Sequence, residues 1–460
     1  MKKQIITLVV AALSLSSCGI YTKYKPVTTV PDKLYGTDVT VVDTFVTAGS
    51  TGSLADLSWR QLFTDPQLQA LIEQGLQNNT DLQSAQWRVE EARASLSAAR
   101  LAYLPSFALS PQGTVSSFDK GKASQIYSLP VTSNWEIDIF GRLTNAKRRA
   151  KALHAQSQEY ELAVKTQLIA NLANAYYTLL MLDAQLAISK ETEVKWKESV
   201  RVMQALKNAG QGNEAGLAQT EATYYSICTT VLDLQEQISQ VENSICLMLG
   251  ETPRSIRRGK LEGQVLPQEL FVGIPLQLLA NRPDVKAAEL ALTQAFYSTN
   301  EARSAFYPSI TLSGSAGWTN GAGEMILNPG KLLLSAVGSL TQPLFNNGQN
   351  IARLKIAKAQ QEEAKLAFTQ SLLNAGAEVN NALKQNQTAR DKASFYTKQI
   401  ASLQTAVSST RLLMQHGSST YLEVLTAQQT LLTAELTQVG NRFQEIQSVI
   451  NLYQALGGGR

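Results

Sequence analysis

The clearest alternation of apolar and polar residues in the chain follows Pro308. Alternate positions fall into an apolar or small set and a small, mostly polar set: Ile310, Leu312, Gly314, Ala316 and Trp318, against Thr311, Ser313, Ser315, Gly317 and Thr319. This period of two predicts a β-strand with one apolar face. The pattern is typical of a strand in a membrane β-barrel, where lipid-facing and lumen-facing positions alternate. An edge strand of a soluble sheet is the alternative.

The same stretch occurs twice, and this favours the barrel strand. The residues around Pro105 match those around Pro308, 203 positions later, and Asp81 and Asp284 have the same spacing. Three glycine positions then repeat at a spacing of 207: Gly141 and Gly348, Gly210 and Gly417, and Gly250 and Gly457. The chain therefore consists of two tandem copies of a unit of about two hundred residues, far longer than a solenoid repeat.

Each copy is expected to contribute two strands that cross a membrane. Their expected bounds are about 106–118 and 126–138 in the first copy, and about 309–319 and 331–345 in the second. Pro111 interrupts the first of them. Trp135 and Trp318 lie near strand ends on apolar faces, where a membrane–water interface favours an amphipathic ring. For Trp135, which lies close to a helix start, packing beneath the barrel is the alternative.

Long segments without helix-breaking residues follow each pair of strands. Residues 142–209 contain neither Pro nor Gly, and residues 349–416 contain only Gly376. At 1.5 Å per residue such a helix could extend about 100 Å, several times the length of a typical globular helix. A turn that contains glycine ends each of these helices, at Gly210 and Gly212 in the first copy and at Gly417 in the second. The chain then returns through two more predicted helices, at 214–249 and 421–456.

The last helix carries a coiled-coil seam. Its apolar residues step by four and three: Leu432, Leu436, Val439, Phe443, Ile446, Ile450 and Tyr453. This spacing predicts knobs-into-holes packing over about three heptads. A soluble bundle or a cytoskeletal coiled coil would also explain the helices, but it would not explain the strands or the amino terminus.

The amino terminus is typical of a bacterial secretion signal. Two lysines precede an apolar core at residues 5–15, which is too short to span a bilayer as a helix. The residues that follow, up to Cys18, resemble a lipobox, so we expect removal of residues 1–17 and acylation of Cys18. Ordinary secretory cleavage nearby is the alternative. Because Gly19 is not an acidic residue of the kind that retains lipoproteins in the inner membrane, the resemblance favours the outer membrane.

Charge and composition exclude several classes of protein. The net charge is only +4 and the charges are interspersed, so we expect no binding of nucleic acid. Cys228 and Cys246 lie about 27 Å apart along one helix and cannot pair within it. The two histidines, His154 and His416, belong to no metal-like or catalytic constellation, and there is no phosphate loop. We therefore expect no cofactor, no metal and no enzymatic activity.

Membrane crossing must involve several chains. The mature chain has no apolar run of about eighteen residues, so we expect no transmembrane helix. If the protein crosses a membrane, it must do so as a closed β-barrel. Four strands are too few, because small barrels begin at about eight. Three chains would give twelve.

Four segments together resemble the OprM/NodT lipoprotein branch of the TolC-like outer-membrane factors: Trp59 to Leu68, Ile274 to Glu289, Phe306 to Leu312 and Asn451 to Gly459. The resemblance covers nearly the whole mature chain. It implies a mainly α, internally duplicated fold in which a homotrimer completes a 12-stranded β-barrel in the outer membrane and a periplasmic α-barrel. It also implies a periplasmic adaptor and an inner-membrane pump, often of the resistance-nodulation-division type. We expect an amino-terminal arm at 18–57 and the two repeats at 58–260 and 261–460.

The resemblance also indicates a gate. In similar channels the turn before the last helix lines a closed periplasmic tip, with an apolar ring at the position of Leu422 and acidic rings at those of Glu423 and Thr426. Because Thr426 is not acidic, a single ring of carboxylates is expected. Glu423 facing water on the outer helix surface is the alternative. At the level of function, the alternative to an exit duct is a structural or binding coiled-coil lipoprotein of the periplasm.

Overall fold

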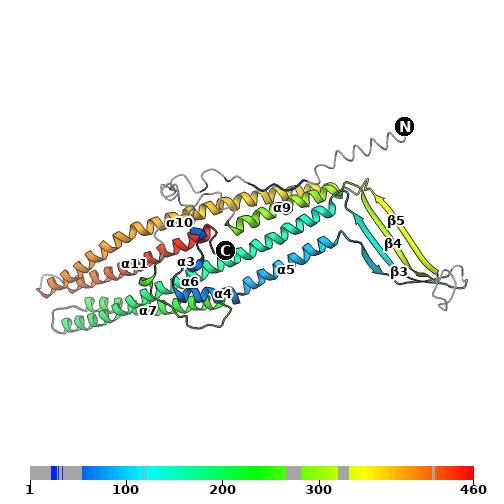
Figure 1. The fold of residues 1–460 in the computed structure, drawn as a ribbon. Helices are drawn as coiled ribbons and strands as arrows, with labels where there is room; N and C mark the ends of the chain where they lie inside the picture. Colours follow the sequence, from blue (N-terminus) through cyan, green and yellow to red (C-terminus); the bar gives the residue numbers. More distant parts are fainter. Residues whose placement is uncertain are drawn as a thin grey trace. The chain divides into compact units, whose positions relative to one another are not determined.

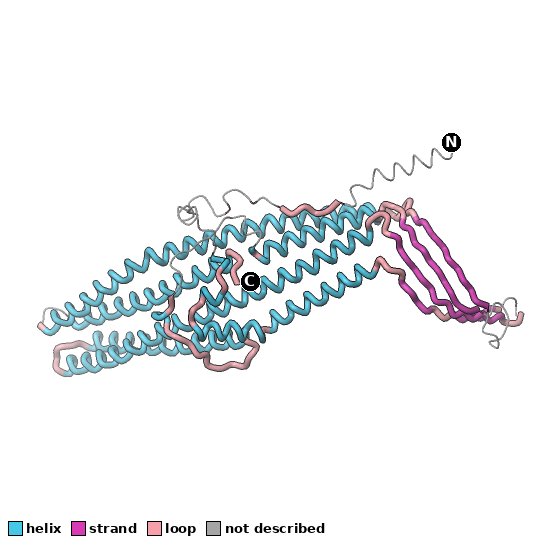
Figure 2. The backbone as a smooth tube through the Cα atoms, in the orientation of Figure 1, coloured by secondary structure: helices cyan, strands magenta, loops and turns pink. Residues whose placement is uncertain are grey.

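The computed structural model describes residues 22–27, 30, 34, 54–117, 119, 121–265, 281–319, 331–416 and 420–459. The signal peptide, Cys18, Gly417, the turn at 321–328 and most of the arm at 18–57 lie outside the described residues. The described part is mainly helical with one small sheet, which is the predicted class of secondary structure (Figures 1 and 2).

The chain divides into two compact units, and each unit takes corresponding parts from both repeats. The first comprises residues 1–28, 86–159 and 286–371, and the second comprises residues 29–85, 160–285 and 372–460. The division therefore cuts across the repeats expected at 58–260 and 261–460. Each repeat contributes strands to the first unit and a helical hairpin to the second.

The sheet of the first unit is antiparallel throughout. Its strands are β1 (Ser106–Leu109), β2 (Gln112–Ser116), β3 (Ser124–Ile137), β4 (Ser309–Thr319) and β5 (Lys331–Thr341). The order is β1-β3-β4-β5, and β2 pairs with β3 as well, so five strands occupy four positions. The break between β1 and β2 contains Pro111, the predicted interruption.

The predicted end of the last strand at residue 345 is wrong. Strand β5 ends at Thr341, and Pro343 follows. Proline has no N–H to donate to a neighbouring strand, so Pro343 disfavours extension of the ladder beyond Thr341. Leu344 and Phe345, whose apolar character extended the prediction, are 94% and 84% exposed.

The long helices end close to the predicted residues. They are α6 (Arg142–Asn208), α7 (Glu214–Met248), α10 (Gln349–Gln415) and α11 (Tyr421–Ala455). The shorter ones are α3 (Trp59–Leu62), α4 (Pro66–Asn78), α5 (Thr80–Leu101) and α9 (Pro283–Ser304). Two 3₁₀ turns, Leu54–Asp56 and Leu261–Gly263, complete the described elements.

No described helix is both long and apolar enough to span a bilayer.

The two repeats end in the same backbone contact within the second unit. Gly250 and Gly457 both have positive φ, 69° and 84°. A Cβ at Gly250 would lie 2.9 Å from the Asn78 carbonyl oxygen, and one at Gly457 would lie 2.5 Å from that of Asn281. Asn78 and Asn281 are themselves 203 residues apart, so the duplicated sequence has kept a duplicated contact. Only glycine allows both the left-handed backbone and this approach.

Candidate functional site: the two-faced sheet and the helix tip

One face of the sheet is apolar and exposed. The strand register places Leu109, Val131, Ala316 and Leu334 in one row across four strands, and side chains paired in this way share a face. Eleven large side chains of this face are 39–71% exposed: Phe107, Leu109, Val115, Tyr127, Leu129, Val131, Trp135, Leu312, Trp318, Leu334 and Leu340. So large an apolar face on strands is the pattern of a lipid-facing surface.

The opposite face is lined mainly by small polar residues. The registers place Thr132, Ser315 and Ser335 in one row of this face, and Glu136, Thr311 and Ser339 in another. Thr311 and Ser339 share a hydrogen bond of 3.1 Å between their hydroxyls. Near the helix start, Glu136 pairs with Arg142. Such a face suits contact with water.

Trp135 and Trp318 lie toward opposite ends of the apolar face. Trp135 pairs with Leu312 in the register, and Trp318 lies six residues further along β4. The two levels are therefore about 20 Å apart along the strand. The Trp135 indole N–H donates a 2.9 Å hydrogen bond to the Tyr103 carbonyl oxygen. Both side chains are partly exposed, at 39% and 52%, and their placement at membrane interfaces stays a prediction.

The carboxyl ends of α6 and α10 lie at the same end of the second unit (Figure 1). Gly210 has a φ of 74° and follows α6, and Gly212 lies close to the backbone of residues 206 and 207. The Asn213 side chain caps α7 by accepting a hydrogen bond from the Gly216 N–H at 2.8 Å. Of the second turn, the structure describes the residues from Thr420 onward.

The first turns of α11 have an exposed and a buried side. Leu422 is 46% exposed, and Glu423 and Thr426 are exposed beside it. Val424 and Leu425 are buried, at 2% and 3% exposure. The structure therefore brings the three residues expected at the gate together on the side of α11 that faces away from the packed core of the chain.

Two side-chain contacts define the exposed side. The Thr420 hydroxyl donates to Glu423 Oε1 at 3.2 Å, and the Thr426 hydroxyl donates to the Leu422 carbonyl oxygen at 2.9 Å. Glu423 also lies in the first turn of α11, where a negative charge is favourable to the helix. Its carboxylate can therefore stabilise the helix start as well as present charge to solvent.

A buried cluster holds the tip of α11, and the sequence did not reveal it. Leu425 packs with Trp196 of α6 and Ile227 of α7, and Tyr421 and Leu432 border them. Trp196 is only 2% exposed. Leu425 lies seven residues before the first predicted seam position, Leu432, so extending the seam by one heptad toward the start of the helix would have identified it.

The other end of α11 is fixed by Arg282, from the segment that carried the family resemblance. Its guanidinium donates to both oxygens of Asp284 at 2.9 and 2.6 Å, to Glu378 at 2.7 Å and to the Ala455 carbonyl oxygen at 2.9 Å. Burial raises the pKa of Asp284, but the hydrogen bonds and charge of Arg282 outweigh it and hold that pKa below its usual range. The arginine side chain is 8% exposed.

The equivalent position in the first repeat makes the same contact. Asn79, which lies 203 residues before Arg282, donates from its side chain to the Met248 carbonyl oxygen at 2.9 Å. Met248 and Ala455 are themselves 207 residues apart. Both repeats therefore contain a side-chain hydrogen bond to the end of the return helix, and in the Asn-Arg-Pro-Asp motif of the second repeat the donor is a charged arginine.

The structure describes both cysteines of α7. Cys246 is buried and Cys228 partly buried, and both are free thiols. Among the described residues, no group of three or more His, Cys, Asp or Glu side chains is arranged to hold a metal ion.

Comparison with known proteins places this geometry in a family. The sequence model of the outer membrane efflux proteins matches residues 71–251 and 274–458, one segment for each repeat. The chain belongs to the outer membrane efflux protein family. Its localisation is the outer membrane, as predicted.

Individual relatives match over almost their full length. The chain is 30% identical to the cation efflux system protein CusC of Escherichia coli O6:H1, over 97% of each chain. It is 28% identical to the probable outer membrane lipoprotein SilC of Salmonella typhimurium, over 89% of this chain and 90% of SilC. The solved outer-membrane channel OprN superposes with a TM-score of 0.86 at 26% identity, covering 96% of this chain and 99% of that one. The predicted TolC-like fold class is confirmed.

Proposed function

We propose that three copies of the chain form a passive exit duct of a tripartite efflux system. The observation that carries this proposal is the two-faced sheet, which has four strand positions per chain. Three sheets joined at their edges would close a barrel of twelve strands with an apolar outside and a polar lumen, and closure leaves no unpaired edge in lipid. The alternative, a periplasmic coiled-coil lipoprotein, does not explain a sheet with one exposed apolar face.

The duct is gated at the tip by Leu422 and Glu423. Three Leu422 side chains, one from each chain, meet on the axis and exclude water, and three Glu423 carboxylates set the charge of the opening. Full burial of each leucine would favour closure by about 1.5–3 kcal/mol. Thr426 contributes a hydroxyl and no charge. The exposure of these residues, beside the buried Val424 and Leu425, supports this assignment.

Single-channel conductance in a planar bilayer tests the gate. Leu422→Ser removes the apolar ring and is expected to raise the conductance of the isolated trimer. The matched control is Leu247→Ser, which replaces a leucine that is 75% exposed at the far end of α7. It should conduct like the parent. Equal conductance of parent and Leu422→Ser would place the constriction elsewhere.

Opening requires partners that act on the tip. We assign to the turns at Gly210 and Gly417 the contact with a periplasmic adaptor, and to the system an inner-membrane pump of the resistance-nodulation-division type. The adaptor must pull the turns apart, because burial of the three Leu422 side chains favours the closed state. The pump selects the cargo. The name of CusC assigns cation efflux to that relative, and a duct lined by hydroxyl groups places little restriction on what passes.

The chain is also anchored by acyl groups on Cys18. The likeness to SilC, whose name describes a lipoprotein, supports this assignment. Cys18→Ser should abolish labelling by a radioactive fatty acid. Labelling that persists in this variant would show that Cys18 is not the modified residue.

A further inference from the structure

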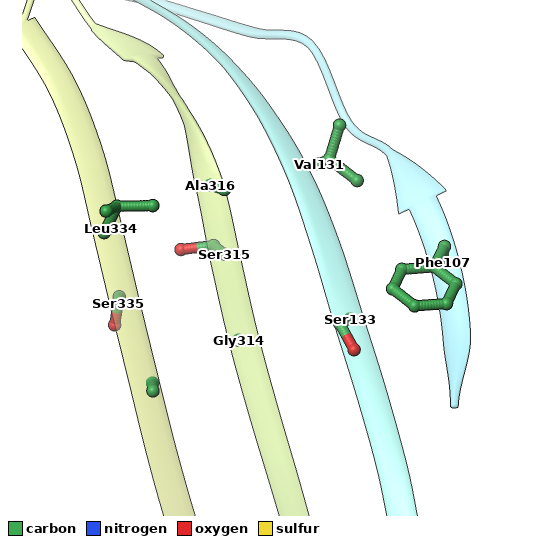
Figure 3. A pocket seen from close by; sticks show the side chains of 9 residues that line it. Phe107, Val131, Ser133, Gly314, Ser315, Ala316, Leu334 and Ser335 are labelled. Atoms are coloured by element: carbon green, nitrogen blue, oxygen red, sulfur yellow. The ribbon is translucent and has the colours of Figure 1, made fainter. Parts of the chain in front are cut away.

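The apolar face of the sheet contains a hollow of about 460 Å³. Figure 3 shows Leu334 at one flank of the hollow and Val131 and Phe107 at the other, with the strand carrying Gly314 and Ser315 between them. The strand register explains this shape. Phe107, Ser133, Gly314 and Ala336 form one row across four strands, so three small residues follow one aromatic ring. The next row, which contains Val131, Ala316 and Leu334, provides one side wall.

Gly314 at the centre of the hollow is not required by backbone packing. At Gly317, on the opposite face, a Cβ would lie 2.3 Å from the Leu129 carbonyl oxygen, so that glycine is needed. At Gly338 the Leu312 side chain already lies 3.4 Å from the position of a Cβ. At Gly314 the nearest atom would be the Ser335 carbonyl oxygen, at an ordinary 3.5 Å. A glycine inside a strand often marks a bulge, a tight bend, or a place where a ligand or another backbone approaches closely. The strand register runs through Gly314 without a bulge, and its Cβ position is free of backbone clash.

The hollow lies between the levels of Trp135 and Trp318, which are predicted to mark the membrane interfaces. Gly314 is two residues from Leu312, the level of Trp135, and four residues from Trp318. It is therefore about 7 Å and about 14 Å along the strand from the two tryptophan levels. The apolar band of an outer-membrane barrel is about 25 Å tall, so the hollow falls inside it.

We propose that this hollow binds one acyl chain of an outer-membrane lipid on each protomer. The proposal rests on the proposed barrel, which turns this face toward lipid. The chain lies along the row of Ser133, Gly314 and Ala336, with Val131 and Leu334 on one side and its end against Phe107. From Phe107 to Ala336 the row spans three strand spacings, about 14 Å. A bulky residue at Gly314 would occupy the middle of this path.

Native mass spectrometry of the detergent-extracted trimer tests the site. As collision energy is raised, the parent is expected to keep up to three lipids per trimer after the others have left. Gly314→Leu should lose these retained lipids. The matched control is Gly113→Leu on β2, which pairs with Tyr127 on the same face outside the hollow. A Cβ there would also have its nearest atom at 3.5 Å. This control should keep them.

Three outcomes would overturn the proposal. They are a parent that retains no lipid beyond the level of Gly314→Leu, equal loss from Gly113→Leu, and retained masses that match detergent. Bilayer conductance of the same trimers is measured in parallel. Loss of the lipid with conductance unchanged from the parent supports the site, whereas a Leu422→Ser trimer that does not conduct would count against the exit duct and not against the site.

Discussion

Helix α11 is packed differently at its two ends. Near its carboxyl end, Ile446, Val449, Ile450, Leu452 and Tyr453 are all at most 2% exposed. That end also accepts the hydrogen bond from Arg282 at Ala455. At its amino end, Leu422 and Glu423 are exposed and the helix is held through Leu425 against two other helices. A helix packed in this way can move at its amino end while its carboxyl end keeps its contacts, which is what a gate requires.

The largest effect is expected from weakening the packing of the amino end of α11. Leu425→Ala removes most of a buried side chain between Trp196 and Ile227, at a cost of about 2–3 kcal/mol to the closed tip. The ratio of open to closed channels should rise more than about tenfold, because each 1.4 kcal/mol is a factor of ten. Single-channel recording measures the ratio. An unchanged ratio together with a lower melting temperature would show that Leu425 supports the fold and not the gate.

The converse change is made at the fixed end. Arg282→Met should lower the free energy of unfolding by about 2 kcal/mol, because the Ala455 carbonyl loses its buried partner and Asp284 its ion pair. Conductance of the remaining folded trimer should be normal. The control is Arg254→Met, whose exposed pair with Glu251 contributes less than about 1 kcal/mol. Thermal unfolding of the trimer measures both, and equal losses would contradict the special role of Arg282.

The same variant should change the response to acid. The folded-state pKa of Asp284 is held below its usual range, so its contribution to stability is present above that range and is lost as the pH falls through the depressed folded-state pKa. The parent should therefore lose more stability on acidification than Arg282→Met does. Parallel slopes would show that Asp284 does not contribute.

The smallest effect is expected at Glu423. Glu423→Gln should reduce the preference for cations by less than about fivefold, since two unit charges 4 Å apart interact by only about 1 kcal/mol in water. The control is Glu214→Gln in the first turn of α7, which removes a similar helix-start charge from the other turn. Reversal potentials in a salt gradient measure the preference. If the control lowers it equally, the effect belongs to the whole tip and not to a ring of Glu423.

Local patterns in the sequence predicted most elements of the fold. Strand β4 could be predicted because apolar and polar residues alternate along most of it, and α6 and α10 because proline and glycine are almost absent from them. The end of β5 was missed because the apolar residues Leu344 and Phe345 continue past Pro343. Elements could be predicted where proline or glycine interrupts the backbone hydrogen bonds, or where the absence of both allows them to continue.

Long-range contacts could not be predicted in the same way. The seam on α11 indicated an apolar face, but nothing in it selects Trp196 of the other repeat as the partner of Leu425. The Asn-Arg-Pro-Asp motif entered the sequence analysis only as part of the family resemblance, whereas the structure shows the Arg282 guanidinium donating to a carbonyl oxygen 173 residues away. Such partners depend on how the repeats pack, and periodicity within one segment does not record this. The gate residues came from the family resemblance.

Crosslinking at the tip tests the central claim most directly. Leu422→Cys places a thiol in each of three chains at the proposed apolar ring, while Cys246 is buried and Cys228 partly buried. If the three residues meet on the axis, mild oxidation should link two chains on a denaturing gel and abolish opening of the channel, and a reductant should restore both. Chains that remain unlinked, with conductance unaffected by oxidation, would contradict closure of the duct at Leu422.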